Sequence, residues 1–198
     1  MKLLHAVLVI CAGLFASVAS AQSYLITVDT SELEGTEGYV NFQFNPADLT
    51  APAADASILQ WLGSTTLIDA PLVEGNVTGS LPSIVTLNNG TAFNDYFQAA
   101  QFGDAFSFIV QFSGNVSPSA LGTSFALALY AADGSTPLLT DDVSGSLVRF
   151  ELSSAGIDYL ASSSAVQVTP VPLPAAAWLL LSGIVTLAGA TRSGRRLG

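Results

Sequence analysis

Hydrophobic and polar residues alternate along most of the chain between residues 22 and 170, and the period is two rather than 3.6. Val40, Phe42 and Phe44 fall on one face of an extended segment, with polar residues between them. Alternation of this kind predicts β-strands with one buried face. The pattern recurs at 106–112 and 148–152, so we expect this middle region to be built from strands.

Two other runs, 24–28 and 125–130, are apolar at nearly every position, which predicts strands covered on both faces. Residues 46–56 form either a short helix or a loop, and residues 161–169 predict a last strand that fades into a linker. Turn-forming pairs such as Asn89-Gly90 and Asp133-Gly134 separate the runs. Weaker strand candidates are 58–62, 66–68, 84–87, 93–97 and 165–169. Roughly eight to ten strands with such turns predict an all-β domain over residues 22–169, an antiparallel β-sandwich or jelly roll.

Residues 1–21 have the three parts of a secretory signal peptide. Lys2 gives a positive start, an apolar run follows it, and Ala19 and Ala21 are the small residues that signal peptidase needs before a cut at Gln22. We therefore expect export through Sec-type machinery. The alternative is an uncleaved N-terminal anchor, for which the apolar run is short.

Residues 170–198 carry a second hydrophobic segment. It begins with a proline-containing motif, which consists of Val171, Pro172, Leu173, Pro174 and Ala175. An apolar stretch follows at about 175–191. A basic tail (192–198) with Arg192, Arg195 and Arg196 closes the segment. The apolar stretch predicts a single, short transmembrane helix, and the arginines place its far end in the cytoplasm and the middle region outside. The alternative is a plain, permanent C-terminal anchor.

This order of parts resembles the PEP-CTERM sorting signal in its VPLPA variant, which residues 171–175 match letter for letter. The resemblance implies a Gram-negative host and an exosortase, an integral membrane cysteine protease that cuts near the motif and passes the protein to the cell surface or the extracellular matrix. Leu173 stands where the commoner form of the signal has Glu. Segments 24–30, 38–46, 86–88 and 91–97 also resemble a recurrent ectodomain type of such proteins, from which no catalytic residue is carried over.

The net charge of the middle region and the residue types that it lacks exclude several classes of function. All fifteen acidic residues lie between Asp29 and Asp158, where Arg149 is the only base, so this region carries 1 − 15 = −14. Such a charge opposes binding to nucleic acid and suits a soluble surface outside the cell. Cys11 and His5 belong to the expected signal peptide, so the mature chain has neither residue type. We therefore predict no Ser-His-Asp or Cys-His enzyme and no ordinary zinc site.

Carboxylates and aromatic rings are the remaining candidates for binding a ligand. Acidic residues in two loops are candidate ligands for a structural calcium ion, the only cofactor considered, unless they simply face water: Glu32, Glu34, Glu37, Asp141 and Asp142. Trp61 is a candidate sugar platform, although large aromatic residues in strands normally build the core. Tyr39, Tyr96 and Tyr130 are further amphipathic rings, and Asn94 and Asp95 would be partners of Tyr96 on a concave edge.

These observations favour an exported, non-catalytic surface or matrix protein, and the resemblance implies an association with exopolysaccharide or biofilm. The expected partners are the export machinery, signal peptidase, an exosortase-type protease and envelope polysaccharide. One alternative is a carbohydrate-binding module of the envelope. A glycoside hydrolase that uses two carboxylates is a third reading, but Glu32 and Glu34 lie among turn residues rather than on a strand.

Overall fold

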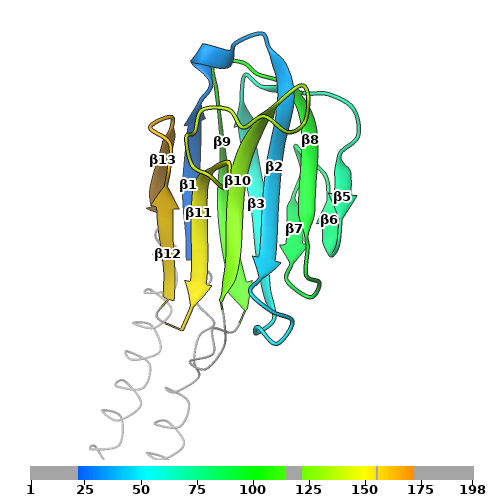
Figure 1. Cartoon of the computed structure of the whole chain (residues 1–198), viewed down its shortest axis with the longest axis vertical. Coiled ribbons are helices and arrows are strands. Elements are labelled where there is room, and N and C mark those ends of the chain that lie inside the picture. The colour runs from blue at the N-terminus through cyan, green and yellow to red at the C-terminus, as the bar shows by residue number, and fades with distance from the viewer. Residues whose placement is uncertain (1–21, 115–121, 155, 172–198) are drawn as a thin grey trace, which may run out of the picture.

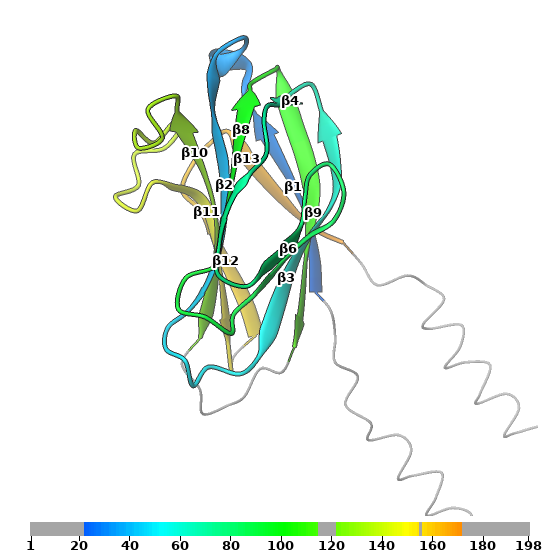
Figure 2. The same cartoon turned by 90° about the vertical axis from the view of Figure 1, so that its right-hand side faces the viewer.

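The computed structural model describes residues 22–114, 122–154 and 156–171. They form two antiparallel β-sheets that pack face to face, so the expectation of an all-β sandwich is confirmed (Figure 1; Figure 2). No helix within these residues is long and apolar enough to cross a membrane. The expected signal peptide, basic tail and transmembrane segment lie outside the described residues.

Strands of the first sheet, sheet A, follow the order β13-β1-β9-β3-β7-β6. Their bounds are β1 Gln22–Asp29, β3 Ala54–Gly63, β6 Val77–Gly79, β7 Val85–Asn88, β9 Ala105–Gly114 and β13 Val166–Val171. Sheet B follows the order β12-β11-β10-β2-β8-β4, and β5 also pairs with β8. Its strands are β2 Glu37–Pro46, β4 Thr66–Leu67, β5 Leu72–Glu74, β8 Asp95–Gln101, β10 Thr123–Ala131, β11 Ser146–Ser153 and β12 Gly156–Ala161. A short 3-10 helix, η1 (Ser31–Leu33), joins β1 to β2.

The core lies between the sheets and is rich in phenylalanine. Alternate residues of β2, β9 and β10 point inward, and the rings of Phe42, Phe108 and Phe125 are fully buried. Phe42 meets Phe108 edge-on across the two sheets, with ring centroids 5.1 Å apart. Edge-on aromatic pairs add about 0.5–1.5 kcal/mol beyond the apolar area that they bury.

The expectation that 24–28 is covered on both faces is wrong. Tyr24, Ile26 and Val28 are buried, but Leu25 on the opposite face is partly exposed to solvent. The outer face of an antiparallel sandwich sheet needs no second layer, so an apolar residue there does not indicate one. The run 125–130 behaves more as expected, because the small side chain of Ala128 on its outer face is also buried.

Residues 46–56 are a loop followed by a strand. β2 ends at Pro46, β3 begins at Ala54, and Asp48 accepts hydrogen bonds from the backbone and hydroxyl of Thr50 in the loop between them. The expected linker at the end of the domain is instead part of a strand, because β13 continues through Pro170 to Val171. β5, β6 and β12 were not expected from the alternation pattern.

The two ends of the described domain lie side by side. Ser23 of β1 is the register partner of Val171 of β13, so the chain enters and leaves at one end of the sandwich (Figure 1). We call this the terminal end, and it also contains the loops 47–53 and 89–94. The opposite end contains η1 and the loops 102–104, 132–145 and 162–165, and we call it the acidic end.

Candidate functional site

Three aromatic rings lie on the outer face of sheet B, away from the core. Tyr39 of β2 stacks on Phe97 of β8 with ring centroids 4.4 Å apart and planes 24° from parallel. Tyr130 of β10 lies 5.8 Å from Phe97. All three side chains are partly exposed. We call Tyr39, Phe97 and Tyr130 the outer aromatic cluster.

Polar groups adjoin this cluster on the same face. The Asn41 amide, which is 1% exposed, donates to the Asp95 carboxylate and, at 3.4 Å, to the Tyr96 carbonyl oxygen. Glu74 of β5 is the register partner of Asp95. Burial and the neighbouring Glu74 charge raise the pKa of Asp95, although the Asn41 hydrogen bond opposes them. Burial, with a smaller effect from Asp95, raises the pKa of the Tyr130 hydroxyl.

The loop 132–145 covers part of the cluster. Gly134 has φ +69°, and a β-carbon there would lie 3.8 Å from both the Phe97 and Tyr39 rings. Asp133 fixes the loop's conformation, because its carboxylate accepts from the backbone N–H groups of Ser135 and Thr136 and from the Thr136 hydroxyl. These hydrogen bonds lower the pKa of Asp133 to about 2. The loop, which joins β10 to β11 (Figure 2), therefore holds a defined position next to the outer aromatic cluster.

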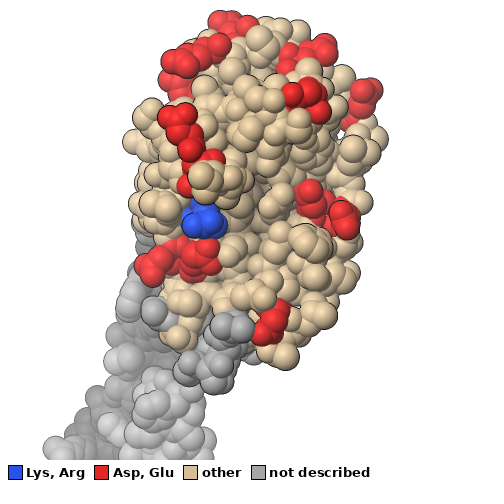
Figure 3. Space-filling view, in the orientation of Figure 1, with Lys and Arg blue, Asp and Glu red and all other residues tan. Residues whose placement is uncertain are grey.

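This arrangement has the chemistry of a sugar-binding surface. Aromatic faces offer an apolar contact for the C–H groups of a pyranose, while Asp95, held by Asn41, and the Tyr130 hydroxyl offer hydrogen-bonding groups beside them. Figure 3 views this face and shows one basic group among acidic ones. Arg149 is the only Lys or Arg among the described residues.

Trp61 lies elsewhere, against the core. Its ring stacks on Phe106 with centroids 4.7 Å apart and planes 22° from parallel, and the side chain is partly buried. A bulge causes this orientation. Gln60 has φ 55°, and the pairing of β3 with β9 shifts register between Leu59 and Leu62. The extra residue turns Trp61 to the face that Ile58 occupies. The Trp61 ring thus packs against the core, on Phe106 and Phe108, whereas the outer aromatic cluster lies on the outer face of a sheet.

Tyr96, Asn94 and Asp95 separate in the structure. Tyr96 is fully buried, and its hydroxyl accepts from the Leu81 backbone N–H and donates to Gln98. Asn94 is also fully buried and donates to the carbonyl oxygens of Phe44 and Thr91. Only Asp95 reaches the outer face. Tyr96 and Asn94 therefore stabilise the fold from buried positions. Phe97, rather than Tyr96, is the aromatic residue of β8 that lies beside Asp95 on the outer face.

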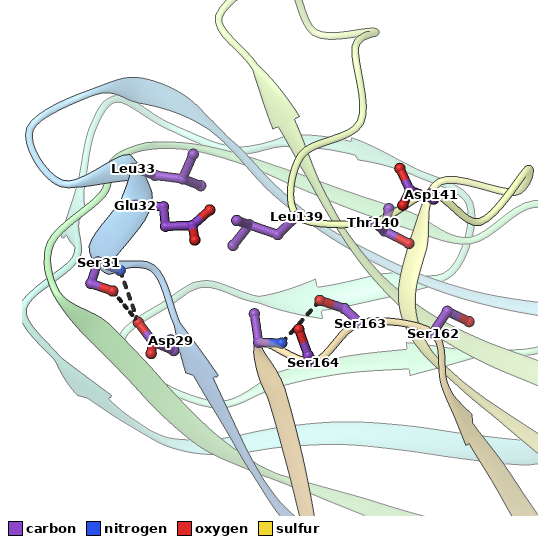
Figure 4. A pocket seen from close by; sticks show the side chains of 11 residues that line it. Asp29, Ser31, Glu32, Leu33, Leu139, Thr140, Asp141, Ser162, Ser163 and Ser164 are labelled. Atoms are coloured by element: carbon purple, nitrogen blue, oxygen red, sulfur yellow. Dashed lines mark hydrogen bonds between the residues drawn. The ribbon is translucent and has the colours of Figure 1, made fainter.

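A hollow of about 650 Å³ opens at the acidic end. It is lined by η1 and by residues of the loops 132–145 and 162–165, and Figure 4 shows the side chains around it. Glu32 and Asp141, candidate calcium ligands from separate loops, both line this hollow together with Asp29. Asp29 is already engaged, because its carboxylate accepts from the backbone and hydroxyl of Ser31, which lowers its pKa.

The other calcium candidates lie outside the hollow. Glu34 and Glu37 do not line it, and Asp142 accepts from the backbone N–H and hydroxyl of Ser144. Those hydrogen bonds lower the pKa of Asp142. Among the described residues, no three acidic side chains converge closely enough to hold a metal ion. Calcium binding stays a prediction from the sequence.

The predicted processing sites fall at or beyond the borders of the described domain. Gln22 is the first residue of β1 and Val171 is the last of β13. The remaining residues named for these sites lie outside the described residues: Ala19, Ala21, Pro172, Leu173, Pro174, Ala175, Arg192, Arg195 and Arg196.

Comparison of the chain with protein-family models, with curated proteins and with solved structures finds no match.

Proposed function

We propose that the protein is an exported, non-catalytic β-sandwich that is displayed at the cell surface or in its exopolysaccharide matrix. A signal peptide at residues 1–21 delivers it across the membrane. A VPLPA-type PEP-CTERM signal at residues 170–198 holds it there until an exosortase-type protease acts. The protein is then released to or attached at the surface.

The pairing of Ser23 with Val171 is the observation that carries this proposal. Both hydrophobic segments of the sequence attach to the same end of one folded domain. A domain whose ends are so placed can fold on one side of a membrane while either segment is inserted. The −14 charge of the region between them supports an aqueous location for the domain.

Mass spectrometry of the mature protein tests this routing. In cells that contain the sorting protease, we expect an N-terminus at Gln22 and loss of the segment that contains Arg192, Arg195 and Arg196. In cells without the protease, the arginine-containing segment should remain. Surface protein that keeps this segment when the protease is present would refute processing, and protein with residues 1–21 still attached would refute export by a cleaved signal.

We propose polysaccharide binding as the activity of the displayed domain, and the outer aromatic cluster with Asp95 beside it favours this activity. The strand orders β1-β9-β3-β7 and β2-β8-β4, with sequential strands alternating between sheets, support assignment as a jelly roll with β10–β13 added at one side. Jelly rolls include lectin domains. A neutral glycan suits the cluster best, because the acidic surface repels anionic polymers.

Affinity electrophoresis of the full chain in gels with soluble neutral polysaccharides, namely dextran, mannan and mixed-linkage β-glucan, tests this activity. We expect retardation by at least one polymer and its loss in Phe97→Ala. Phe93→Ala is the matched control, because Phe93 is exposed outside the cluster and should leave retardation unchanged. Release of reducing ends that depends on Asp95 would show hydrolysis instead. Equal migration in all gels would refute binding of these sugars.

A further inference from the structure

The terminal end carries apolar side chains at the tips of its loops. Leu49 in the loop 47–53 is 69% exposed, and Phe93 in the loop 89–94 is 67% exposed. The loop 47–53 joins β2 to the start of β3. The loop 89–94 follows β7, whose last residue, Asn88, pairs with Asp55 at the start of β3. Both loops therefore lie at the same end of the sandwich as Gln22 and Val171 (Figure 1).

Hydrogen bonds join the loops 47–53 and 89–94 to each other and to the adjoining strands. The Asn89 amide donates to the Pro52 carbonyl oxygen at 2.8 Å and to the Thr123 hydroxyl at 2.8 Å, and its oxygen accepts from the Ala54 backbone N–H. Asn94 links the second loop to the end of β2 through the Phe44 carbonyl oxygen. Leu49 and Phe93 are therefore held outward by a fixed backbone.

Charge is distributed unequally between the two ends. Eight of the acidic residues lie at the acidic end: Asp29, Glu32, Glu34, Glu37, Asp104, Asp133, Asp141 and Asp142. Counted in the same way, with the bordering strand residues included, the terminal end has three: Asp48 in the loop 47–53, Asp55 at the start of β3 and Asp95 at the start of β8. Figure 3 shows acidic side chains over the upper part of the molecule and fewer of them over its lower part. The end that carries Leu49 and Phe93 is thus the less charged one.

The chain beyond Val171 limits how far this end lies from a bilayer. Four backbone steps separate Val171 from Ala175, where the apolar stretch begins. Even fully extended, they span at most about 14 Å. The headgroup layer itself occupies roughly 5–8 Å outside the hydrocarbon core. A domain held by this connection has its terminal end at the membrane surface.

We propose that the terminal end is a lipid-facing surface, and that Leu49 and Phe93 enter the headgroup layer while the C-terminal segment spans the bilayer. The inference rests on the proposed function, because it needs residues 175–191 in the membrane. It adds a fixed orientation of the domain, in which the acidic end and the outer face of sheet B point to the aqueous side. Apolar side chains at an interface gain from leaving water, and acidic groups are repelled by anionic lipids.

Site-specific fluorescence in vesicles tests the orientation. The full chain, carrying Cys11→Ser, is reconstituted into phosphatidylcholine vesicles, with an environment-sensitive dye placed through Phe93→Cys or Leu49→Cys. Val143→Cys is the matched control, because Val143 is a fully exposed apolar residue at the acidic end. We expect blue-shifted emission at positions 93 and 49 and loss of about half of it with nitroxide-labelled lipids, as for groups at headgroup depth. Position 143 should show neither change.

The outcomes separate the two levels of the proposal. Protein that does not float with the vesicles would refute membrane insertion of the C-terminal segment, and with it the proposed function. Protein that floats but keeps aqueous emission at positions 93 and 49 would refute only the lipid-facing surface. Equal quenching at positions 93 and 143 would show that the domain has no fixed orientation, which also overturns the inference.

Discussion

Single buried side chains hold the loops of this sandwich in place, and Asn94 is the clearest case. Its amide donates to the carbonyl oxygens of Phe44 and Thr91, and its oxygen accepts from the Asn76 backbone N–H at 2.8 Å. Polar groups left buried without partners cost about 1–3 kcal/mol each.

Asn94→Ala should therefore lower the free energy of unfolding by roughly 2–4 kcal/mol, because it leaves several of these groups unsatisfied. Urea unfolding measures the difference. Asn76→Ala is the control, since it keeps the backbone donor and removes only an exposed side chain, and its effect should be small. Equal losses in both variants would contradict this role for Asn94.

Asp95 should make stability depend on pH in the direction opposite to that of a typical paired carboxylate. Burial raises its pKa in the folded state, so its stabilising, protonated form dominates below the unfolded-state pKa. This contribution is lost as pH rises through the folded-state value, which lies above 3.8. The ionised Asp95 therefore opposes folding at neutral pH.

Asp95→Asn is expected to raise the free energy of unfolding at pH 7, with a smaller gain at pH 3. Chemical denaturation at the two values measures it. Asp104→Asn removes the same charge from an exposed position and controls for general charge repulsion. A loss of stability at pH 7 in the Asp95 variant would show that the carboxylate is needed for folding.

At the scale of elements, the bulge in β3 determines where its side chains point. Gln60 adopts φ 55°, a conformation that glycine reaches without strain and β-branched residues rarely adopt. Gln60→Gly should keep stability within about 1 kcal/mol of the parent, whereas Gln60→Val should cost about 1–3 kcal/mol. The fluorescence of Trp61 reports whether its contact with Phe106 is retained. A destabilised Gly variant together with an unchanged Val variant would be inconsistent with the bulge.

The bulge also shows why the sequence predicted the strands better than the site. Period-two alternation marked the cores of β2, β9 and β11, because one face of each is buried and the other is solvated. Alternation gives the face of a residue only while the register is unbroken, so Trp61 could not be assigned to the core. Phe97 was overlooked because an aromatic residue in a strand is normally counted toward the core.

Short edge strands were beyond the reach of the pattern. β5 and β6 span only Leu72–Glu74 and Val77–Gly79, too few residues for a period to be visible. β12 exposes Tyr159 and Leu160, so its hydrophobic residues do not mark one buried face. The convergence of Glu32 and Asp141 on one hollow depends on loop geometry that no local signal encodes.

At the scale of the whole molecule, the charge of −14 between Asp29 and Asp158 should make stability sensitive to salt. Apart from the Arg149–Glu151 pair at 3.1 Å, no ion pair forms among the described residues to offset it. Raising ionic strength from about 0.01 to 0.15 M shortens the screening length from about 30 to 8 Å. The melting temperature should therefore rise with NaCl, as calorimetry would measure. A falling melting temperature would mean that attractive pairs dominate.

The antiparallel match of β13 with β1 also has a mechanical consequence. Six register pairs, from Val166 to Val171, join the last strand to the sheet. If residues 172–198 anchor the domain and the domain binds a polymer, as proposed, a pull between anchor and polymer acts on Val171 along these strands. All hydrogen bonds of the ladder then share the load in shear, instead of unzipping in turn from one end, so the attachment resists drag from flowing liquid.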